Sequence, residues 1–394
     1  MAQLLNKTKN SSPNLSCLFW FFFSPLILLN PSCTQATQPL PNPRLLNAYT
    51  ALQAWKHAII SDPKNFTSNW NGPNVCNYTR VYCAPPPDNP NTTTVAGIDL
   101  NDGNIVGSLP DELGLLTDIA LFHLNSNRFT GAIPRSFEKL HLLYELDISN
   151  NEFTGSFPSV VLSLPSLKYL DLRFNQFDGS IPSTLFDLNL DAIFINNNKF
   201  QSNVPKSIGN SPASVIVLAN NRFNGCLPNG LGKMGGTLDE INLRNMGLYG
   251  CLPKEIGELT NLTVFDVSFN YLSGPLPQTM GGMKELEKLN VAHNKISGEI
   301  PASICSLPRL ENFTYSYNYI SGEPPQCVNL PSKDDRQNCI LGKSSQRFPQ
   351  DCETVLGHPL NCVVFGCSAI SPPPQLPPSP APTAVAPMTP PPVY

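Results

Sequence analysis

The chain has 394 residues, 14% of them charged, and its formal net charge is −4 at pH 7. A weakly acidic chain of this kind offers no basic surface for a nucleic acid, so nucleic acid is not expected as a partner. Its unusual features are 41 prolines and 12 cysteines.

Residues 1–36 are typical of a secretory signal. An apolar run over residues 15–29 follows Lys7 and Lys9, and small residues near Ala36 offer a cleavage site. The run is short for a membrane span, which makes a signal anchor the weaker alternative. Cleavage after Ala36 leaves ten cysteines, and an even number favours disulfides in a secreted chain.

Residues 37–94 are expected to form an N-terminal cap. Apolar residues recur at steps of three and four between Arg44 and Ile60, which predicts a helix that covers the open end of the core that follows. Cys76 and Cys83 come next, and the proline-rich, polar residues 85–93 predict a loop before the first strand.

Residues 95–326 repeat one unit ten times, with the pattern L-x-x-L-x-L-x-x-N-x-(apolar)-x-G-x-(apolar)-P. The closing prolines, from Pro110 to Pro325, are 23 to 25 residues apart. A unit of about 24 residues cannot bury its own apolar side chains, so neighbouring units must share a core, which predicts a solenoid. Apolar residues two apart, such as Phe122 and Leu124, point inward from a short strand, and the residues between them face outward on one parallel sheet.

An asparagine follows most of these strands, and its side chain can bond backbone groups of its own turn and of the next unit. The asparagines are Asn127, Asn151, Asn175, Asn198, Asn221, Asn270, Asn294 and Asn318. Gly103 and Met246 interrupt this ladder, and local looseness is expected there.

Cys226 and Cys251 occupy the same slot of adjacent units. Equivalent positions of stacked strands lie about 5 Å apart, within the reach of a disulfide, so the sequence predicts a bridge between these two cysteines.

Residues 327–370 are a cysteine-rich hinge with few apolar residues. Cys305 and Cys327 lie about one repeat apart and are expected to pair. The remaining cysteines, Cys339, Cys352, Cys362 and Cys367, allow three pairings among themselves, and the sequence does not choose between them. Zinc binding, with His358 nearby, is the alternative, but the irregular spacing favours disulfides.

Residues 371–394 contain 11 prolines and cannot form a core, so an extended polyproline II tail is expected. No apolar span or lipid-anchor signal follows them.

The repeat resembles the plant-type extracellular leucine-rich repeat, whose L-x-G-x-I-P signature appears at residues 129–134 with Phe129 in place of leucine. The segments 311–318, 322–327 and 334–339, together with the Ser-Pro-Pro-Pro of the tail, resemble plant leucine-rich repeat extensins. The resemblance implies an α/β solenoid, a horseshoe of about ten 24-residue repeats with a concave parallel β-sheet and disulfide caps, in which Cys76 pairs with Cys83. The tail lacks serine followed by four prolines, so anchoring in the wall is not implied.

Catalytic motifs are missing from the sequence. None of the five histidines lies in H-E-x-x-H, there is no G-x-S-x-G, and Gly342-Lys343-Ser344 lacks the first glycine of a phosphate loop. His123 and His293 fall on outward strand positions, where solvated surface histidines are expected. We therefore expect a protein that is not an enzyme and uses no cofactor and no metal.

The outward strand positions carry 11 acidic and 4 basic residues, against 18 and 21 in the rest of the chain. The acidic residues are Asp99, Asp102, Glu145, Asp147, Asp171, Asp191, Asp239, Glu240, Asp266, Glu287 and Glu311, and the basic ones are Lys168, Arg173, Arg244 and Lys288. The aromatic residues are Tyr144, Tyr169, Phe174, Phe194, Phe269 and Tyr317.

A rigid, acidic face with exposed aromatic residues suits a cationic polypeptide, because charge steers the encounter and aromatic anchors supply binding energy. A merely solvated sheet face is the alternative. The predicted contacts are Glu145, Asp147, Tyr169, Asp171, Glu240 and Asp266.

The resemblance implies secreted, basic, cysteine-rich peptide hormones of the rapid alkalinisation factor type as ligands, in the control of wall expansion. Wall polysaccharide (pectin) and receptor kinases are further candidate partners, and a homodimer stays open. An inhibitor of polygalacturonases and a structural wall protein are the alternative functions. A receptor-kinase ectodomain is disfavoured because no membrane span follows Pro325.

Five glycosylation sequons are expected to be modified, at Asn65, Asn77, Asn91, Asn261 and Asn312. A glycan on Asn312 would block that end of the concave face and leave the N-terminal and middle repeats for the ligand.

Overall fold

The computed structural model describes residues 42–358 and 360–362. The predicted secretory signal and the proline-rich tail lie outside these residues.

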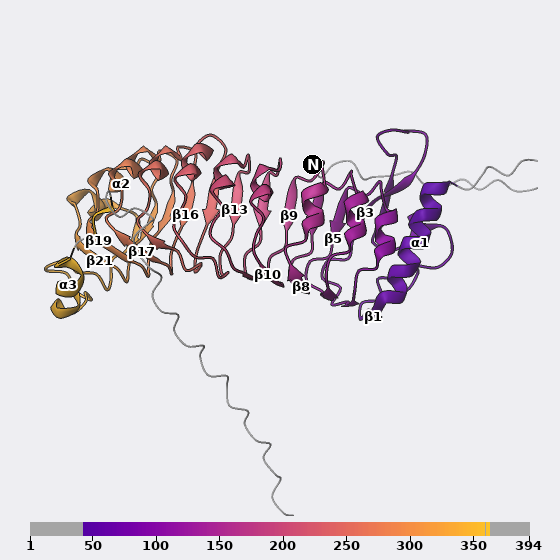
Figure 1. Ribbon diagram of the computed structural model, residues 1–394, viewed down its shortest axis with the longest axis horizontal. Helices are drawn as coiled ribbons and strands as arrows, with labels where there is room; N and C mark the ends of the chain where they lie inside the picture. The colour runs from indigo at the N-terminus through magenta and orange to yellow at the C-terminus, as the bar shows by residue number, and fades with distance from the viewer. Residues whose placement is uncertain (1–41, 359, 363–394) are drawn as a thin grey trace, which may run out of the picture. The chain divides into compact units, whose positions relative to one another are not determined.

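The main sheet has twelve strands that stand side by side in chain order (Figure 1). The first pair, β2 with β3, is antiparallel, and the pairings from β3 to β22 are parallel. The strands are β2 (Val81–Ala84), β3 (Thr94–Asp99), β5 (Leu121–His123), β7 (Glu145–Asp147), β9 (Tyr169–Asp171), β11 (Ala192–Phe194), β13 (Val215–Val217), β14 (Glu240–Asn242), β16 (Val264–Asp266), β18 (Lys288–Asn290), β20 (Asn312–Thr314) and β22 (Ser332–Asp334). The predicted continuous parallel sheet is confirmed, and its outward side is called the concave face below.

A second row of strands, called the flank, alternates with the main-sheet strands along the chain. It forms a six-stranded sheet of β1 (Ile59–Ser61), β4 (Val106–Gly107), β6 (Arg128–Gly131), β8 (Glu152–Ser156), β10 (Gln176–Gly179) and β12 (Lys199–Phe200), and a four-stranded sheet of β15 (Tyr249–Gly250), β17 (Tyr271–Gly274), β19 (Lys295–Glu299) and β21 (Tyr319–Gly322). An isolated bridge between Asn203 and Asn224 lies between the two sheets. The flank is thus interrupted between β12 and β15, in the unit of Asn221. The units of Gly103 and Met246 have paired flank strands, β4 with β6 and β15 with β17, so the strand pairing does not show the looseness predicted at these two positions.

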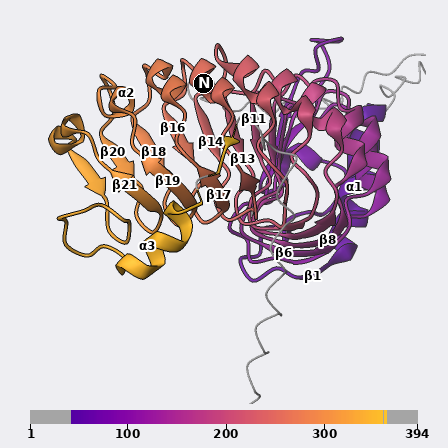
Figure 2. The same cartoon turned by 60° about the vertical axis from the view of Figure 1, so that its left-hand side comes forward.

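Short helices form the third side of each turn. Figure 2 shows them in a row that follows the order of the strands. The 3-10 helices are η1 (Val75–Asn77), η2 (Asp111–Leu115), η3 (Arg135–Lys139), η4 (Ser159–Ser163), η5 (Ser183–Asp187), η6 (Lys206–Asn210), η7 (Asn229–Met234), η8 (Lys254–Glu258), η9 (Gln278–Gly282) and η10 (Pro325–Asn329), and a short α2 (Ala302–Cys305) takes the same place in its unit. A proline in extended conformation precedes most of them, because its fixed φ suits the last residue before a helix.

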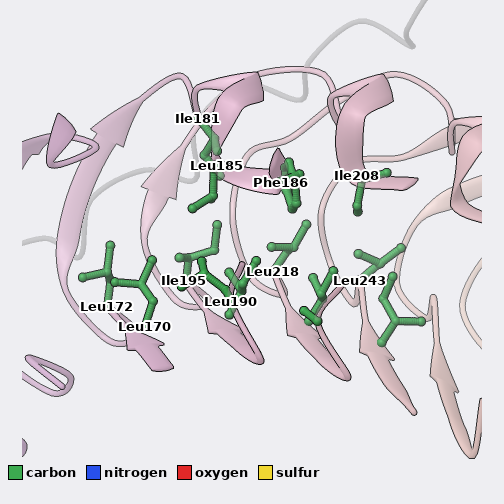
Figure 3. Close-up of a cluster of buried hydrophobic side chains, with 14 of the residues drawn as sticks. Leu170, Leu172, Ile181, Leu185, Phe186, Leu190, Ile195, Ile208, Leu218 and Leu243 are labelled. Carbon is green, nitrogen blue, oxygen red and sulfur yellow. The ribbon is translucent and has the colours of Figure 1, made fainter. Parts of the chain in front are cut away.

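The core runs through the whole stack. The strands from β3 to β20 contribute alternate apolar residues, such as Leu170 and Leu172, that point toward the helix side (Figure 3). The inward pair Phe122 and Leu124 is at most 1% exposed, as predicted. Four phenylalanines from successive units also stack, with ring centroids 6.2–6.4 Å apart: Phe129, Phe153, Phe177 and Phe200.

The asparagine ladder is confirmed, and Asn294 illustrates it. Its Nδ2 donates to the carbonyl oxygens of Val267, Val291 and Ala292 at 3.0, 3.1 and 3.2 Å. Its Oδ1 accepts the N–H of Leu272 at 2.9 Å. One buried side chain therefore joins two neighbouring units, and Asn338 repeats the pattern beyond the last predicted unit.

Replacing Asn294 by alanine is expected to lower the free energy of unfolding by about 2–4 kcal/mol, because a buried N–H and buried carbonyl groups lose their partners. Urea unfolding measures the loss. Asn210→Ala is the matched control, since Asn210 is exposed and donates only to the side chain of Asp187, at 2.9 Å. Equal losses in the two variants would contradict a structural role for the ladder.

The N-terminal cap agrees with the sequence. Helix α1 (Pro43–Ala58) buries Trp55 against Trp70, with ring centroids 5.9 Å apart. The predicted bridge between Cys76 and Cys83 is present, and residues 85–93 form a loop without helix or strand.

The pairing predicted for Cys226 and Cys251 is wrong. Cys251 is bonded to Cys362, 111 residues later in the chain, and Cys226 is also disulfide-bonded. The hinge returns along the flank, where Gly274 at φ +77° leaves room for the sulfur atoms of the Cys251–Cys362 bridge. Stacking of the repeats predicts that Cys226 and Cys251 are adjacent, but it does not predict that the hinge brings Cys362 to Cys251.

The other hinge disulfides are clear. Cys305 pairs with Cys327, as predicted, and Cys339 pairs with Cys352. The latter bridge holds helix α3 (Pro349–Leu356), which contains Cys352. Because Cys362 pairs outside the group of four, the premise that those four cysteines pair among themselves was also wrong.

In the described part of the chain, the helices are too short or too polar to cross a membrane.

Candidate ligand-binding site

Strand register decides which of the predicted contacts lie together. Glu145 on β7 faces Tyr169 on β9, and Asp147 on β7 faces Asp171 on β9. Neighbouring strands lie about 4.8 Å apart, so these four side chains form one group, called the acidic cluster below. Three of its members are half-buried, and Asp171 is buried.

Asp171 is the centre of the acidic cluster. Its side chain is 0% exposed, and Arg173 approaches it with Nε 2.9 Å from Oδ2. Its Oδ1 accepts the N–H of Arg173 at 3.1 Å, and Tyr169 Oη lies 3.4 Å from Oδ2. These contacts fix the carboxylate in place.

Burial and the nearby Asp147 carboxylate raise the pKa of Asp171 to about 7, against the lowering effect of Arg173. Burial and the charges of Asp171 and Asp147 raise the pKa of Tyr169 to about 12, which keeps the phenol neutral. The acidic cluster therefore gains negative charge as the pH approaches neutrality.

The rim of the acidic cluster is held by local contacts. Glu145 Oε2 lies 3.1 Å from His123 Nε2. Asp147 Oδ1 accepts the N–H and the hydroxyl of Ser149 at 3.0 and 2.6 Å. His123 thus has a carboxylate partner and is not a merely solvated surface residue.

An apolar floor lies beside the acidic cluster. Phe194 packs on Tyr169 with ring centroids 5.4 Å apart, and Arg173 lies 5.1 Å from its ring centroid. The next strand adds the half-buried Val215 and Val217, each in register with a residue of β11. The face therefore offers an apolar surface next to negative charge.

The other two predicted residues lie apart from the acidic cluster, because β11 and β13 come between. Asp266 accepts hydrogen bonds from Ser268 and from Asn290 Nδ2, so both of its oxygens are engaged. Glu240, on β14, is half-buried, and its carboxylate makes no hydrogen bond or ion pair to any residue in 42–358 or 360–362. Glu240 can therefore receive a cation from a ligand.

Sequence reasoning missed an ordered arrangement of aromatic residues on the same face. Phe269, His293 and Tyr317 stack with centroids 4.0 and 4.2 Å apart, and the guanidinium of Arg244 lies 4.0 Å from the centroid of Phe269. These four residues are called the aromatic strip. His293 is stacked between Phe269 and Tyr317, which contradicts the expectation of a solvated histidine, and burial and the charge of Arg244 lower its pKa. A signal was present in the sequence, since each of the three rings directly precedes a ladder asparagine.

The predicted glycosylation sites differ in access. Asn65, Asn77, Asn91 and Asn261 are exposed. Asn312 is half-buried on β20, where its Oδ1 accepts the hydroxyl of Thr314.

Among the described residues, no group of three or more His, Cys, Asp or Glu side chains could hold a metal ion.

Comparisons with known proteins agree with this architecture. Family models named "Leucine rich repeat" match residues 117–177, 141–200, 261–283 and 285–307, and the "Leucine rich repeat N-terminal domain" matches residues 46–84. Leucine-rich repeat extensin-like protein 6 of Arabidopsis thaliana is 64% identical over 84% of this chain and 70% of its own length. Leucine-rich repeat extensin-like protein 7 is 64% identical over 85% of this chain and 78% of its own length.

Solved structures give the same picture. The Arabidopsis receptor kinase HAESA, in complex with the peptide hormone IDA and the co-receptor SERK1, is 29% identical, with a TM-score of 0.66 over 74% of this chain. The ectodomain of GASSHO1/SCHENGEN3 with CASPARIAN STRIP INTEGRITY FACTOR 2 is 25% identical, with a TM-score of 0.64 over 75% of this chain. The matches span 49% and 38% of those two chains.

Proposed function

From the premise that this chain belongs to the leucine-rich repeat extensin-like proteins, we propose that it binds basic, cysteine-rich signalling peptides on its concave face. The peptides are of the rapid alkalinisation factor type, and their capture in the plant cell wall regulates wall assembly and cell growth.

The observation that carries the proposal is the acidic cluster beside its apolar floor. Glu145 and Asp147 offer charge to lysine or arginine side chains, and Phe194 offers an apolar surface within one strand spacing of Tyr169. Charged groups raise the association rate and fix the register of a partner, while apolar anchors supply most of the affinity.

Relatives in structure support a peptide as the ligand. HAESA was solved with the peptide hormone IDA, and it shares this fold. The four disulfides between described cysteines support an oxidising, extracellular location. Receptor kinases and a second copy of the chain stay predicted partners.

The test is a titration of the full secreted chain with a basic cysteine-rich peptide of the rapid alkalinisation factor class and, separately, with a polygalacturonase. Each titration is run at low and at high salt. We expect submicromolar binding of the peptide that weakens as salt increases, because the contacts are between charges. Binding of the polygalacturonase alone would favour an inhibitor function, and binding of neither would leave a structural wall protein.

A further inference from the structure

The hinge encloses an apolar pocket, called the hinge pocket below, at the C-terminal end of the flank. Helix α3 packs against β19 and β21 at the end of the stack (Figure 1), and the segment 339–347 completes the wall. The cavity has a volume of about 600 Å³, and its apolar lining consists of Ile340, Leu341, Pro349, Leu356 and the bridge between Cys339 and Cys352. Cavities of roughly 300–1,000 Å³ with mostly apolar linings are typical of ligand sites.

The walls of the hinge pocket are held by contacts that need no ligand. Gln346 Oε1 accepts the N–H of Ile340 at 3.2 Å. Gln346 Nε2 donates to the backbone oxygens of Asp335 and Ser344 at 3.1 and 3.2 Å. The disulfide of Cys352 ties α3 to the same segment. The pocket is therefore formed in advance, which lowers the cost of ordering it when a ligand binds.

Apolar side chains at the mouth of the hinge pocket face solvent. Leu341 is 95% exposed and is the most exposed large apolar side chain among the described residues. Phe348, which precedes Pro349 of the lining, is 76% exposed. Removing such surface from water is favourable, so the pocket is complementary to an apolar occupant.

Arg347 gives the hinge pocket a set of hydrogen-bond donors. Its guanidinium lies 4.3 Å from the ring centroid of Tyr319, and its Nε donates to Asn318 O at 2.6 Å. Its two terminal nitrogens form no hydrogen bond or ion pair with residues 42–358 or 360–362. Because a guanidinium has five N–H groups and accepts nothing, these nitrogens suit the carbonyl oxygens of an occupant.

The chain itself carries a segment with this chemistry. Residues 363–394 contain no Asp, Glu, Lys, Arg or His, and residues 371–394 contain 11 prolines. Polyproline II segments repeat every three residues, so Pro374 and Pro377 of Pro374-Gln375-Leu376-Pro377 fall on one face. Their backbone carbonyls have no internal partners, and the preformed conformation costs little entropy when it docks in an apolar groove.

The segment is also tethered close to the hinge pocket. The sulfur of Cys362, bonded to Cys251, lies against Gly274 on β17. Only β19 stands between β17 and β21 in this sheet, so the pocket is about 10 Å away. The stretch from Cys362 to Pro374 spans up to about 37 Å in a polyproline II conformation. Such a tether keeps the segment at an effective concentration of about 1 mM, so a weak intrinsic affinity suffices.

We propose that residues 374–377 dock in the hinge pocket of the same molecule. The two prolines pack on the apolar lining around Leu341, and Arg347 donates to a backbone carbonyl of the segment. The pocket lies on the flank, so docking leaves the acidic cluster open and does not depend on the function proposed for it.

The test places a benzophenone photo-crosslinking amino acid at position 375 of the full secreted chain. Irradiation is expected to join this position to residues 339–357 of the same molecule, as mass spectrometry of the monomer fraction shows. Leu341→Asp should weaken docking about tenfold or more, because a charge replaces an apolar contact, and lower the crosslink yield at least about twofold. Since Leu341 is exposed, this variant should keep the melting temperature of the parent chain.

Val328→Asp is the matched control. Val328 is 70% exposed on η10 and does not line the hinge pocket. An unchanged crosslink yield in this control, with a reduced yield in Leu341→Asp, supports the proposal. The proposal is overturned if both variants lower the yield equally, if Leu341→Asp leaves it unchanged, or if the crosslinks join two copies of the chain. A higher yield from the same probe at position 383 would also overturn the assignment to residues 374–377.

Discussion

Replacing Glu145 and Asp147 by their amides is expected to weaken the binding of a basic, cysteine-rich peptide by about a hundredfold. Both carboxylates lie on β7 at the rim of the acidic cluster. Among the described residues, Glu145 contacts His123, and Asp147 forms no ion pair. Each close charge pair at a protein interface contributes roughly 1.5 kcal/mol or more, and two such pairs correspond to about a factor of one hundred. Calorimetric titration of the E145Q/D147N variant measures the loss.

The matched control is D111N/E112Q, which also removes two negative charges from the protein. Asp111 and Glu112 are exposed on η2, on the helix side of the stack, and not on the concave face. This control should lose little affinity, because distant exposed charges are screened by salt. Equal losses in the two double variants would mean that net charge, and not the acidic cluster, attracts the peptide.

Affinity for the basic peptide is expected to increase by between about tenfold and a hundredfold from pH 5 to pH 7.5. Because the pKa of Asp171 is raised to about 7, its carboxyl is protonated at pH 5. A bound cation favours the ionised form, so binding at pH 5 must release a proton, and each pH unit below the pKa weakens binding by up to about tenfold. Calorimetry in buffers of different ionisation enthalpy measures both the affinity and the released proton.

Asp171→Asn should flatten the dependence of peptide affinity on pH, and it separates the effect of Asp171 from that of His123, which also faces the acidic cluster.

The stability of the free protein gives an independent check on the raised pKa of Asp171. A raised pKa means that the folded state holds its proton more tightly than the unfolded chain, whose aspartate titrates near 3.9. The contribution to stability is therefore complete below about pH 4 and is lost as the pH rises to about 7, and D171N should lack this loss. A peptide affinity of the wild-type protein that does not change between pH 5 and pH 7.5 would contradict the role given to Asp171.

Most of the fold was predictable because each unit repeats the same local solution. The alternation around Phe122 and Leu124 fixed the inward face of the strands, and the asparagine after each strand marked the ladder that Asn294 illustrates. Repetition of one pattern removes the usual ambiguity about which elements are neighbours, since each unit must stack on the next.

The disulfides could be predicted only where they follow the repeat. Cys305 and Cys327 follow the stack, so their pairing could be predicted. The bridge from Cys251 to Cys362 could not, because it depends on the path of a hinge that does not repeat. The short helices were also missed, since their five-residue sequences carry no periodic pattern long enough to recognise.

The candidate site was predictable in composition but not in arrangement. Glu145 and Asp147 were identified correctly as outward residues, but the burial of Asp171 depends on packing between strands. The aromatic strip required knowledge of the left-handed turn, because only that conformation brings Phe269, His293 and Tyr317 into contact.

The bridge between Cys251 and Cys362 closes a covalent loop that limits how far the end of the stack can be unfolded by force. A pull between these two cysteines is carried by their sulfur atoms at the start of the four-stranded flank, next to β15, and not by the backbone of residues 252–361. Helix α3 and the last units lie inside the covalent loop that this bridge closes, so the pull does not peel them from the end of the stack. The terminal units, which carry Tyr317 and the end of the aromatic strip, are thereby shielded from the load.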